Sequence, residues 1–186
     1  MNFEYYRNYF FYLEKRVKDL ERYIAFEISN LDTYSIELSS FISDCGGIFN
    51  GFMYEVCKEK SPNKDKFYYS DYKSYLQTNE YYFESKLAFY GFRLMPLSKI
   101  VSQSENEYPK WWTAYNSIKH GGQDNFKQAT LRNAFSILGA LFSVLYQYEL
   151  KSPEYGLDSV NGEASLFCES TIFFTVNDSL PLSWEC

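Results

Sequence analysis

Three long stretches of the sequence carry apolar side chains at alternating spacings of three and four residues. Charged residues fill the remaining positions of the first stretch, 3–28, whose repeat is Phe3, Tyr6, Phe10, Leu13, Val17, Leu20 and Ile24. The second stretch covers 34–59, and the third, about 126–150, is apolar over most of its circumference. Because this spacing places apolar residues on one face of an α-helix, we expect three long helices. The last of them would be central or shared with another subunit.

Weaker patterns lie between and after these stretches. They predict a loop at 60–70, a short helix from Ser70 or Asp71 through Leu76, irregular structure or a small hairpin in 81–100, and a helix from Pro109 to Lys119 or His120. The composition of 151–163 is typical of a linker, and 164–176 is β-prone. We therefore predict an all-α fold, an antiparallel bundle of four to five helices over 1–150. A C-terminal appendage, linker plus short strands, would occupy 151–186.

A pair of glycines, Gly46 and Gly47, interrupts the second long helix. Each glycine costs about 1 kcal/mol relative to alanine inside a helix. The pair therefore indicates a kink or a close approach of another helix, with a binding cleft as the alternative.

The chain has 186 residues, a net charge of −6 and 21% aromatic residues. This acidic balance argues against strong free-standing nucleic-acid binding, and acids interrupt the basic run at 58–66. The most apolar run, 134–146, is shorter than the roughly 20 residues of a membrane-spanning helix, so we expect no membrane association. The charged, aromatic start is unlike a signal peptide, which together with the cysteine pattern predicts a cytoplasmic protein.

The sequence contains no recognisable motif for binding a metal ion or a cofactor. The four cysteines, Cys45, Cys57, Cys168 and Cys186, form no Cys-x-x-Cys pair, and a single histidine cannot complete a Cys₂His₂ site. Cys45 and Cys57 fall on the apolar side of the second helix, where a free thiol acts as a small hydrophobe. No phosphate-binding loop, dinucleotide fingerprint or serine-nucleophile elbow is present. We expect no metal and no cofactor.

The single histidine, His120, lies between a Trp-Trp pair and a Gly-Gly pair. On a helix Trp112, Asn116 and His120 would share a face. Histidine titrates near neutral pH, which makes it a candidate for proton transfer. The alternative is an ordinary helix C-terminus, in which a basic residue in the last turn precedes a glycine. Trp111, Trp112 and Tyr115 would then be core residues.

Around this histidine the chain resembles the HEPN superfamily, small bacterial and archaeal all-helical proteins and domains. The matching residues are Trp112, Tyr115, Asn116, Lys119 and His120, then Ala129, Thr130, Leu131 and Asn133. Weaker likeness extends to 94–100 and 33–49. The resemblance implies a helical homodimer. In active members it also implies a metal-independent ribonuclease with an Arg-x(4–6)-His pair at the dimer interface.

The chain departs from that pattern at position 115, where the family arginine is replaced by Tyr115. A neutral phenol cannot do the work of a guanidinium at a phosphorane. Positions 115 and 120 also lie roughly 140° apart around an ideal helix. They could converge only if the helix broke near 118–119.

Two functions follow from these residues. The first is a HEPN-like module without nuclease activity, acting through a homodimer or a protein partner in a bacterial defence or stress system. The alternative is an endoribonuclease with His120 as general acid or base. Asn116 would assist catalysis, and the binding residues would be Tyr115, Lys119 and Trp112. RNA would be a partner only under this alternative.

Overall fold

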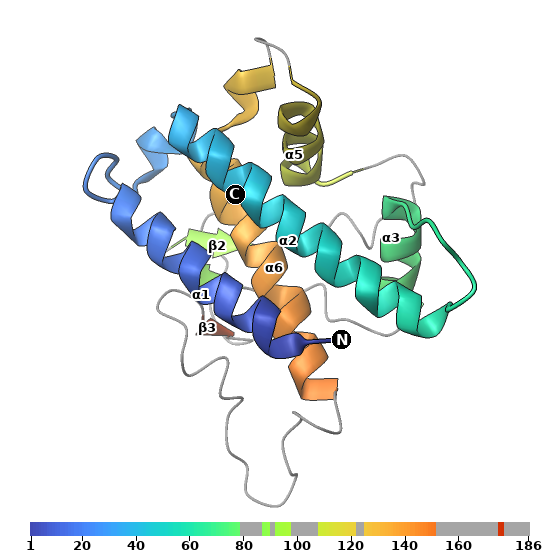
Figure 1. Cartoon of the computed structure of the whole chain (residues 1–186). Coiled ribbons are helices and arrows are strands. Elements are labelled where there is room, and N and C mark those ends of the chain that lie inside the picture. Colours follow the sequence, from blue (N-terminus) through green and yellow to red (C-terminus); the bar gives the residue numbers. More distant parts are fainter. Residues whose placement is uncertain (79–86, 90–91, 98–107, 122–124, 152–174, 177–186) are drawn as a thin grey trace, which may run out of the picture.

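The structure, a computed structural model, describes residues 1–78, 87–89, 92–97, 108–121, 125–151 and 175–176 (Figure 1). Within these ranges it contains five α-helices: α1 (Phe3–Leu20), α2 (Ile36–Lys60), α3 (Tyr69–Thr78), α5 (Lys110–His120) and α6 (Leu131–Lys151). Two short 3-10 helices, η1 (Ile28–Asn30) and η2 (Asn125–Gln128), precede α2 and α6. The predicted all-α bundle is confirmed.

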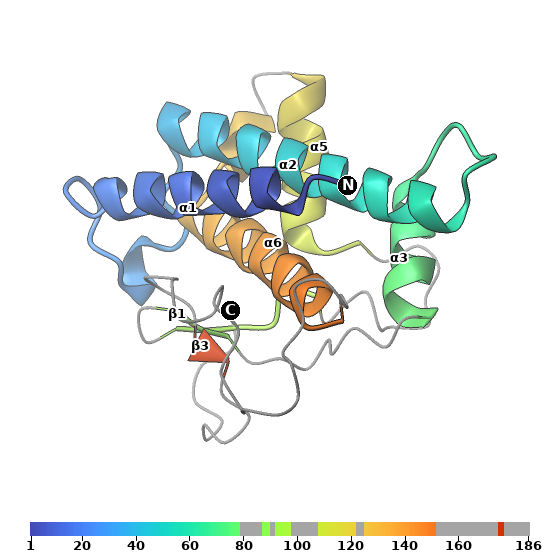
Figure 2. The ribbon, with the colours of Figure 1, turned by 60° about the horizontal axis from the view of Figure 1, so that its bottom comes forward.

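The arrangement is organised around α6 and α2. Figure 1 shows α2 between α1 on one side and α5 and α3 on the other, with α1 and α2 running in opposite directions. Figure 2 shows α6 beneath α1 and α2, with the strands on its far side. Most side chains of α6 are buried, including Leu138, Leu141 and Leu145. The prediction of a central last helix is therefore confirmed.

The first helix is shorter than predicted. It ends at Leu20 rather than continuing to 28, because the backbone N–H groups of Tyr23 and Ile24 both donate to the Leu20 carbonyl and turn the chain. Ile24 still packs against the core from this turn. Because the apolar repeat extends beyond Leu20, the sequence pattern does not indicate where the helix ends.

The start of the last helix also differs from the prediction. The segment from 126 forms η2, and α6 begins only at Leu131. The Thr130 hydroxyl accepts a hydrogen bond from the Asn133 N–H at 3.2 Å, and the Leu131 N–H donates to the Thr33 carbonyl. Since the first N–H groups of α6 are satisfied by a cap and by the segment before α2, the helix cannot extend backwards.

Helix α2 is continuous across Gly46 and Gly47, so the pair makes no break. Ser35 caps it by accepting from the Leu38 N–H at 3.1 Å. The helix is close to its predicted range of 34–59.

A small antiparallel sheet of order β2-β1-β3 completes the described structure. Strands β1 (Leu87–Phe89) and β2 (Phe92–Leu94) pair as a hairpin, which confirms one of the two structures expected for 81–100. Strand β3 (Thr175–Val176) pairs with β1 and reaches the end of the β-prone stretch. The predicted linker at 151–163, apart from Lys151 at the end of α6, and most of the β-prone stretch lie outside the described residues. None of the described helices combines the length and apolarity of a membrane-crossing helix.

Candidate functional site

Helix α5 carries the five candidate site residues, Trp112, Tyr115, Asn116, Lys119 and His120. Pro109 is its N-cap, and its carbonyl accepts from the N–H groups of Trp112 and Thr113. Gly121, with φ of 76°, ends it and donates its N–H to the Ile118 carbonyl. The helix runs unbroken through His120, so the break near 118–119 that would bring positions 115 and 120 together is absent.

The two tryptophans of α5 anchor the helix in the core. Trp111 donates from Nε1 to the Pro96 carbonyl at 2.7 Å, and its ring meets Phe49 of α2 edge-on. Trp112 is only 7% exposed, and its ring centroid lies 4.7 Å from that of Tyr69 on α3. Trp112, Asn116 and His120 therefore lie along one side of α5 in different surroundings. Trp112 belongs to the core, Asn116 is half-buried and His120 is exposed.

Tyr115, at the position where the resemblance would put an arginine, points into the bundle. It is 4% exposed, and its ring lies directly on Gly46 of α2. A Cβ atom at position 46 would come within 2.6 Å of three carbons of that ring. Gly46 therefore permits a close approach of α5 to α2. The sequence predicted a kink or a close approach of another helix at the glycine pair, and the close approach is confirmed. Tyr115 is a packing residue.

Asn116 and Lys119 are each engaged within α5. The Asn116 side-chain amide donates to the Trp112 carbonyl at 3.0 Å, one turn earlier. The Lys119 ammonium lies 5.6 Å from the centroid of the Tyr115 ring, a cation–π distance. Both contacts stabilise the helix and hold the two side chains along its surface.

His120 stands at the exposed end of α5, and its side chain forms no hydrogen bond with any other described residue. It shares the last turn with Lys119, where two basic side chains complement the negative end of the helix dipole. General acid–base chemistry needs a positioned substrate and a group to stabilise developing charge. The arrangement supplies an accessible imidazole and a nearby ammonium, but α5 itself contains no arginine and no acid.

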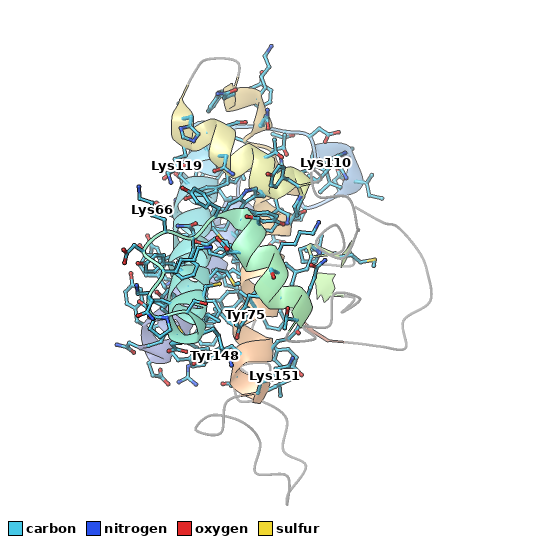
Figure 3. All side chains as sticks on the ribbon, turned by 90° about the vertical axis from the view of Figure 1, so that its right-hand side faces the viewer. Lys66, Tyr75, Lys110, Lys119, Tyr148 and Lys151 are labelled. Atoms are coloured by element: carbon cyan, nitrogen blue, oxygen red, sulfur yellow. The ribbon has the colours of Figure 1, made fainter. Side chains whose placement is uncertain are left out.

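The outward face of α5 is polar. Lys110, Thr113 and His120 are exposed and Ser117 is half-buried, and they form a row along the helix. Figure 3 looks onto α5 and α3 and labels Lys110 and Lys119 toward opposite ends of α5. This face has cationic and hydroxyl groups and no exposed large apolar side chain.

Asn125 is a residue of the site that sequence reasoning missed. Its side-chain amide donates to the carbonyls of Ser117 at 3.0 Å and Gly121 at 2.7 Å. These bonds satisfy carbonyl groups at the C-terminal end of α5 that the helix leaves unpaired. The only available signal was an Asn shortly after a Gly-Gly helix stop.

Among the described residues, the cysteine thiols are not activated for catalysis. Burial raises the pKa of the Cys57 thiol to about 11 and raises that of Cys45 as well. Both thiols, predicted to be small hydrophobes, are buried and remain protonated near neutral pH, so neither is an activated nucleophile. Among the described residues no group of three or more His, Cys, Asp or Glu side chains could hold a metal ion. Cys168 and Cys186 lie outside those residues.

A surface hollow of about 430 Å³ lies between the end of α2 and α3, on the side where Figure 3 labels Lys66 and Tyr75. Its lining includes Lys60, Lys64 and Asp71. The Lys64 ammonium pairs with Asp71 at 2.5 Å and also lies over the Phe67 ring. This pair compensates its own charge, which leaves Lys60 as the other charged side chain of the lining.

Comparisons of the chain with protein-family models, with curated proteins and with solved structures found no match. The likeness to HEPN proteins therefore rests on the sequence alone.

Proposed function

We propose that the chain is a HEPN-like helical binding module without ribonuclease activity. The observation that carries this proposal is the packing of Tyr115 on Gly46. Position 115, where the resemblance would put the catalytic guanidinium, instead carries a phenol ring that packs α5 against α2.

The direction of position 115 supports the proposal further. Because α5 stays helical through His120, positions 115 and 120 remain roughly 140° apart around the helix. An arginine at 115 would leave its backbone in the direction of α2, away from the exposed imidazole. Position 115 thus departs from the family pattern in the direction of its side chain as well as in its residue type.

A module of this kind acts through its surface, by association with a second copy or with a protein partner. The resemblance places such modules in bacterial defence and stress systems. The stable, largely apolar core around α6 and α2 provides a rigid support for such a surface.

Endoribonuclease activity is the second candidate, and the exposure of His120 beside Lys119 is the observation that favours it. His120 would act as general acid or base, with Asn116 and Lys119 near the phosphate. The arrangement provides no charge-stabilising arginine on α5, which ranks this candidate below the first.

One experiment separates the two candidates. Purified full-length protein is incubated with mixed RNA in EDTA, alongside the His120→Ala variant and the matched surface control Lys110→Ala. We expect no cleavage above buffer for any of the three proteins. Cleavage by wild type and by Lys110→Ala that is lost in His120→Ala would overturn the proposal and establish the nuclease.

A further inference from the structure

One flank of α1, on the side of α2, carries a stripe of three tyrosines, Tyr5, Tyr9 and Tyr12. Tyr5 and Tyr12 are 50% and 53% exposed, and Tyr9 is half-buried. Neighbouring ring centroids lie 5.8 Å and 5.7 Å apart, so the rings contact each other in sequence along the helix. The buried face of α1 packs against α2 and α6. Tyr9 also packs against the core, whereas the exposed rings of Tyr5 and Tyr12 lie outside that contact.

The stripe is already ordered in the single chain. The Arg16 guanidinium lies 5.9 Å from the Tyr12 ring centroid at one end. It is held there by ion pairs to Glu37 at 2.7 Å and Asp44 at 2.6 Å, both on α2. Side chains that are fixed before association lose less entropy when a partner binds. Tyrosine is also among the residues enriched in protein interfaces.

The charges beside the stripe indicate what it pairs with. Glu4 and Lys15 flank it near its two ends, eleven residues apart, which is about three helical turns and roughly 16 Å. That spacing puts both on the same edge of the stripe. Lys15 is exposed and forms no ion pair with any other described residue, while Glu4 pairs with Arg7 within its own helix.

We propose that the α1 stripe is the surface that binds a second copy of this chain. The two α1 helices would pair antiparallel about a twofold axis near Tyr9. A twofold axis makes the contact self-complementary. It places each Glu4 opposite Lys15 of the partner subunit, and each Tyr5 near Arg16 of the partner subunit. This inference rests on the proposed binding function and names its interface.

The inference moves the dimer contact away from α5, where the resemblance had placed it. Helix α5 exposes the ammonium groups of Lys110 and Lys119 and contains no acid, so two copies of this face would repel each other. The α1 stripe offers aromatic area flanked by opposite charges. Because one helix face is a small interface, we expect a dissociation constant on the order of micromolar.

The test is a concentration series of the full chain in sedimentation velocity. We expect a reversible monomer–dimer equilibrium that the double variant Tyr5→Ser/Tyr12→Ser weakens at least tenfold. The matched control Tyr23→Ser/Tyr68→Ser removes two tyrosines that are 83% and 65% exposed elsewhere, and should leave dimerisation unchanged. Melting curves establish that each variant is folded.

Charge reversal tests the antiparallel register. Glu4→Lys and Lys15→Glu should each weaken the dimer, and the combination should restore it. A monomer at every concentration, or a dimer insensitive to the stripe variants, overturns the inference. So does a dimer in which the combined reversal is weaker than both single reversals. A monomer without RNA cleavage refutes only this interface, whereas RNA cleavage in EDTA refutes the proposed function itself.

Discussion

Replacing Gly46 with alanine tests the contact on which the account depends. The added Cβ would lie within 2.6 Å of the Cγ, Cδ2 and Cε2 atoms of Tyr115. Cγ is bonded to the Cβ of Tyr115, so a simple ring rotation cannot relieve the clash. Either the ring must change rotamer or α5 must shift relative to α2.

The net cost follows from two opposing effects. Overpacking a core costs about 1–3 kcal/mol, and we take the upper end, about 3 kcal/mol, because three ring atoms are involved. Alanine gains about 1 kcal/mol over glycine inside a helix. We expect Gly46→Ala to lower the free energy of unfolding by about 2 kcal/mol, and the melting temperature by about 4–8 °C.

The neighbouring glycine provides a matched control. A Cβ atom at Gly47 meets nothing within 4 Å, and Gly47 is exposed in the same helix. Gly47→Ala should therefore raise the free energy of unfolding by about 1 kcal/mol. Both variants are measured by urea unfolding, with circular dichroism as the probe.

A double-mutant cycle isolates the contact itself. In a Tyr115→Ala background the ring is absent, so Gly46→Ala should become stabilising, as Gly47→Ala is in wild type. If Gly46→Ala instead stabilises the wild-type chain by the same amount as Gly47→Ala, Tyr115 does not lie on Gly46 and the reasoning is refuted.

Three further predictions concern the surroundings of the site. Asn125→Ala removes two hydrogen bonds to the end of α5 and should lower the free energy of unfolding by about 1–2 kcal/mol, with faster amide exchange in the last turn of α5 as the second measurement. The Lys64 ammonium and a backbone N–H lower the pKa of Asp71, so its stabilising contribution is present above the unfolded value of about 3.9 and is lost as pH falls through the lower folded value. In urea unfolding at several pH values, Asp71→Asn should therefore be less stable than wild type at pH 6, and the difference should shrink below pH about 4; a constant difference would contradict this. Cys45 and Cys57 should resist iodoacetamide in the folded protein at neutral pH and react in urea, as peptide mass mapping would show.

The helical periodicity predicted the bundle but not all of its helix ends. The apolar repeat that begins in α1 continues to Ile24, which packs on the core from the turn after the helix. Ile24 therefore has helical spacing in the sequence without lying in the helix. The start of α6 depends on Thr130 and on hydrogen bonds to the segment before α2, and such long-range contacts leave no local pattern.

The candidate site was predictable only in part. The sequence indicated the helix and its glycine stop, because both of these are local. It could not pair Gly46 with Tyr115, since the two are far apart in the chain and meet only when α5 packs on α2. The cap formed by Asn125 depends on the path of the chain after Gly121.

The most direct test of the central claim, that position 115 is a packing position facing α2, is a nuclear Overhauser measurement on protein with labelled glycine and tyrosine. The account predicts strong cross-peaks between the Gly46 α protons and the Tyr115 ring protons, and none from Gly47 to that ring. A Gly46 resonance without contacts to the Tyr115 ring would contradict the claim and return position 115 to the candidate catalytic surface.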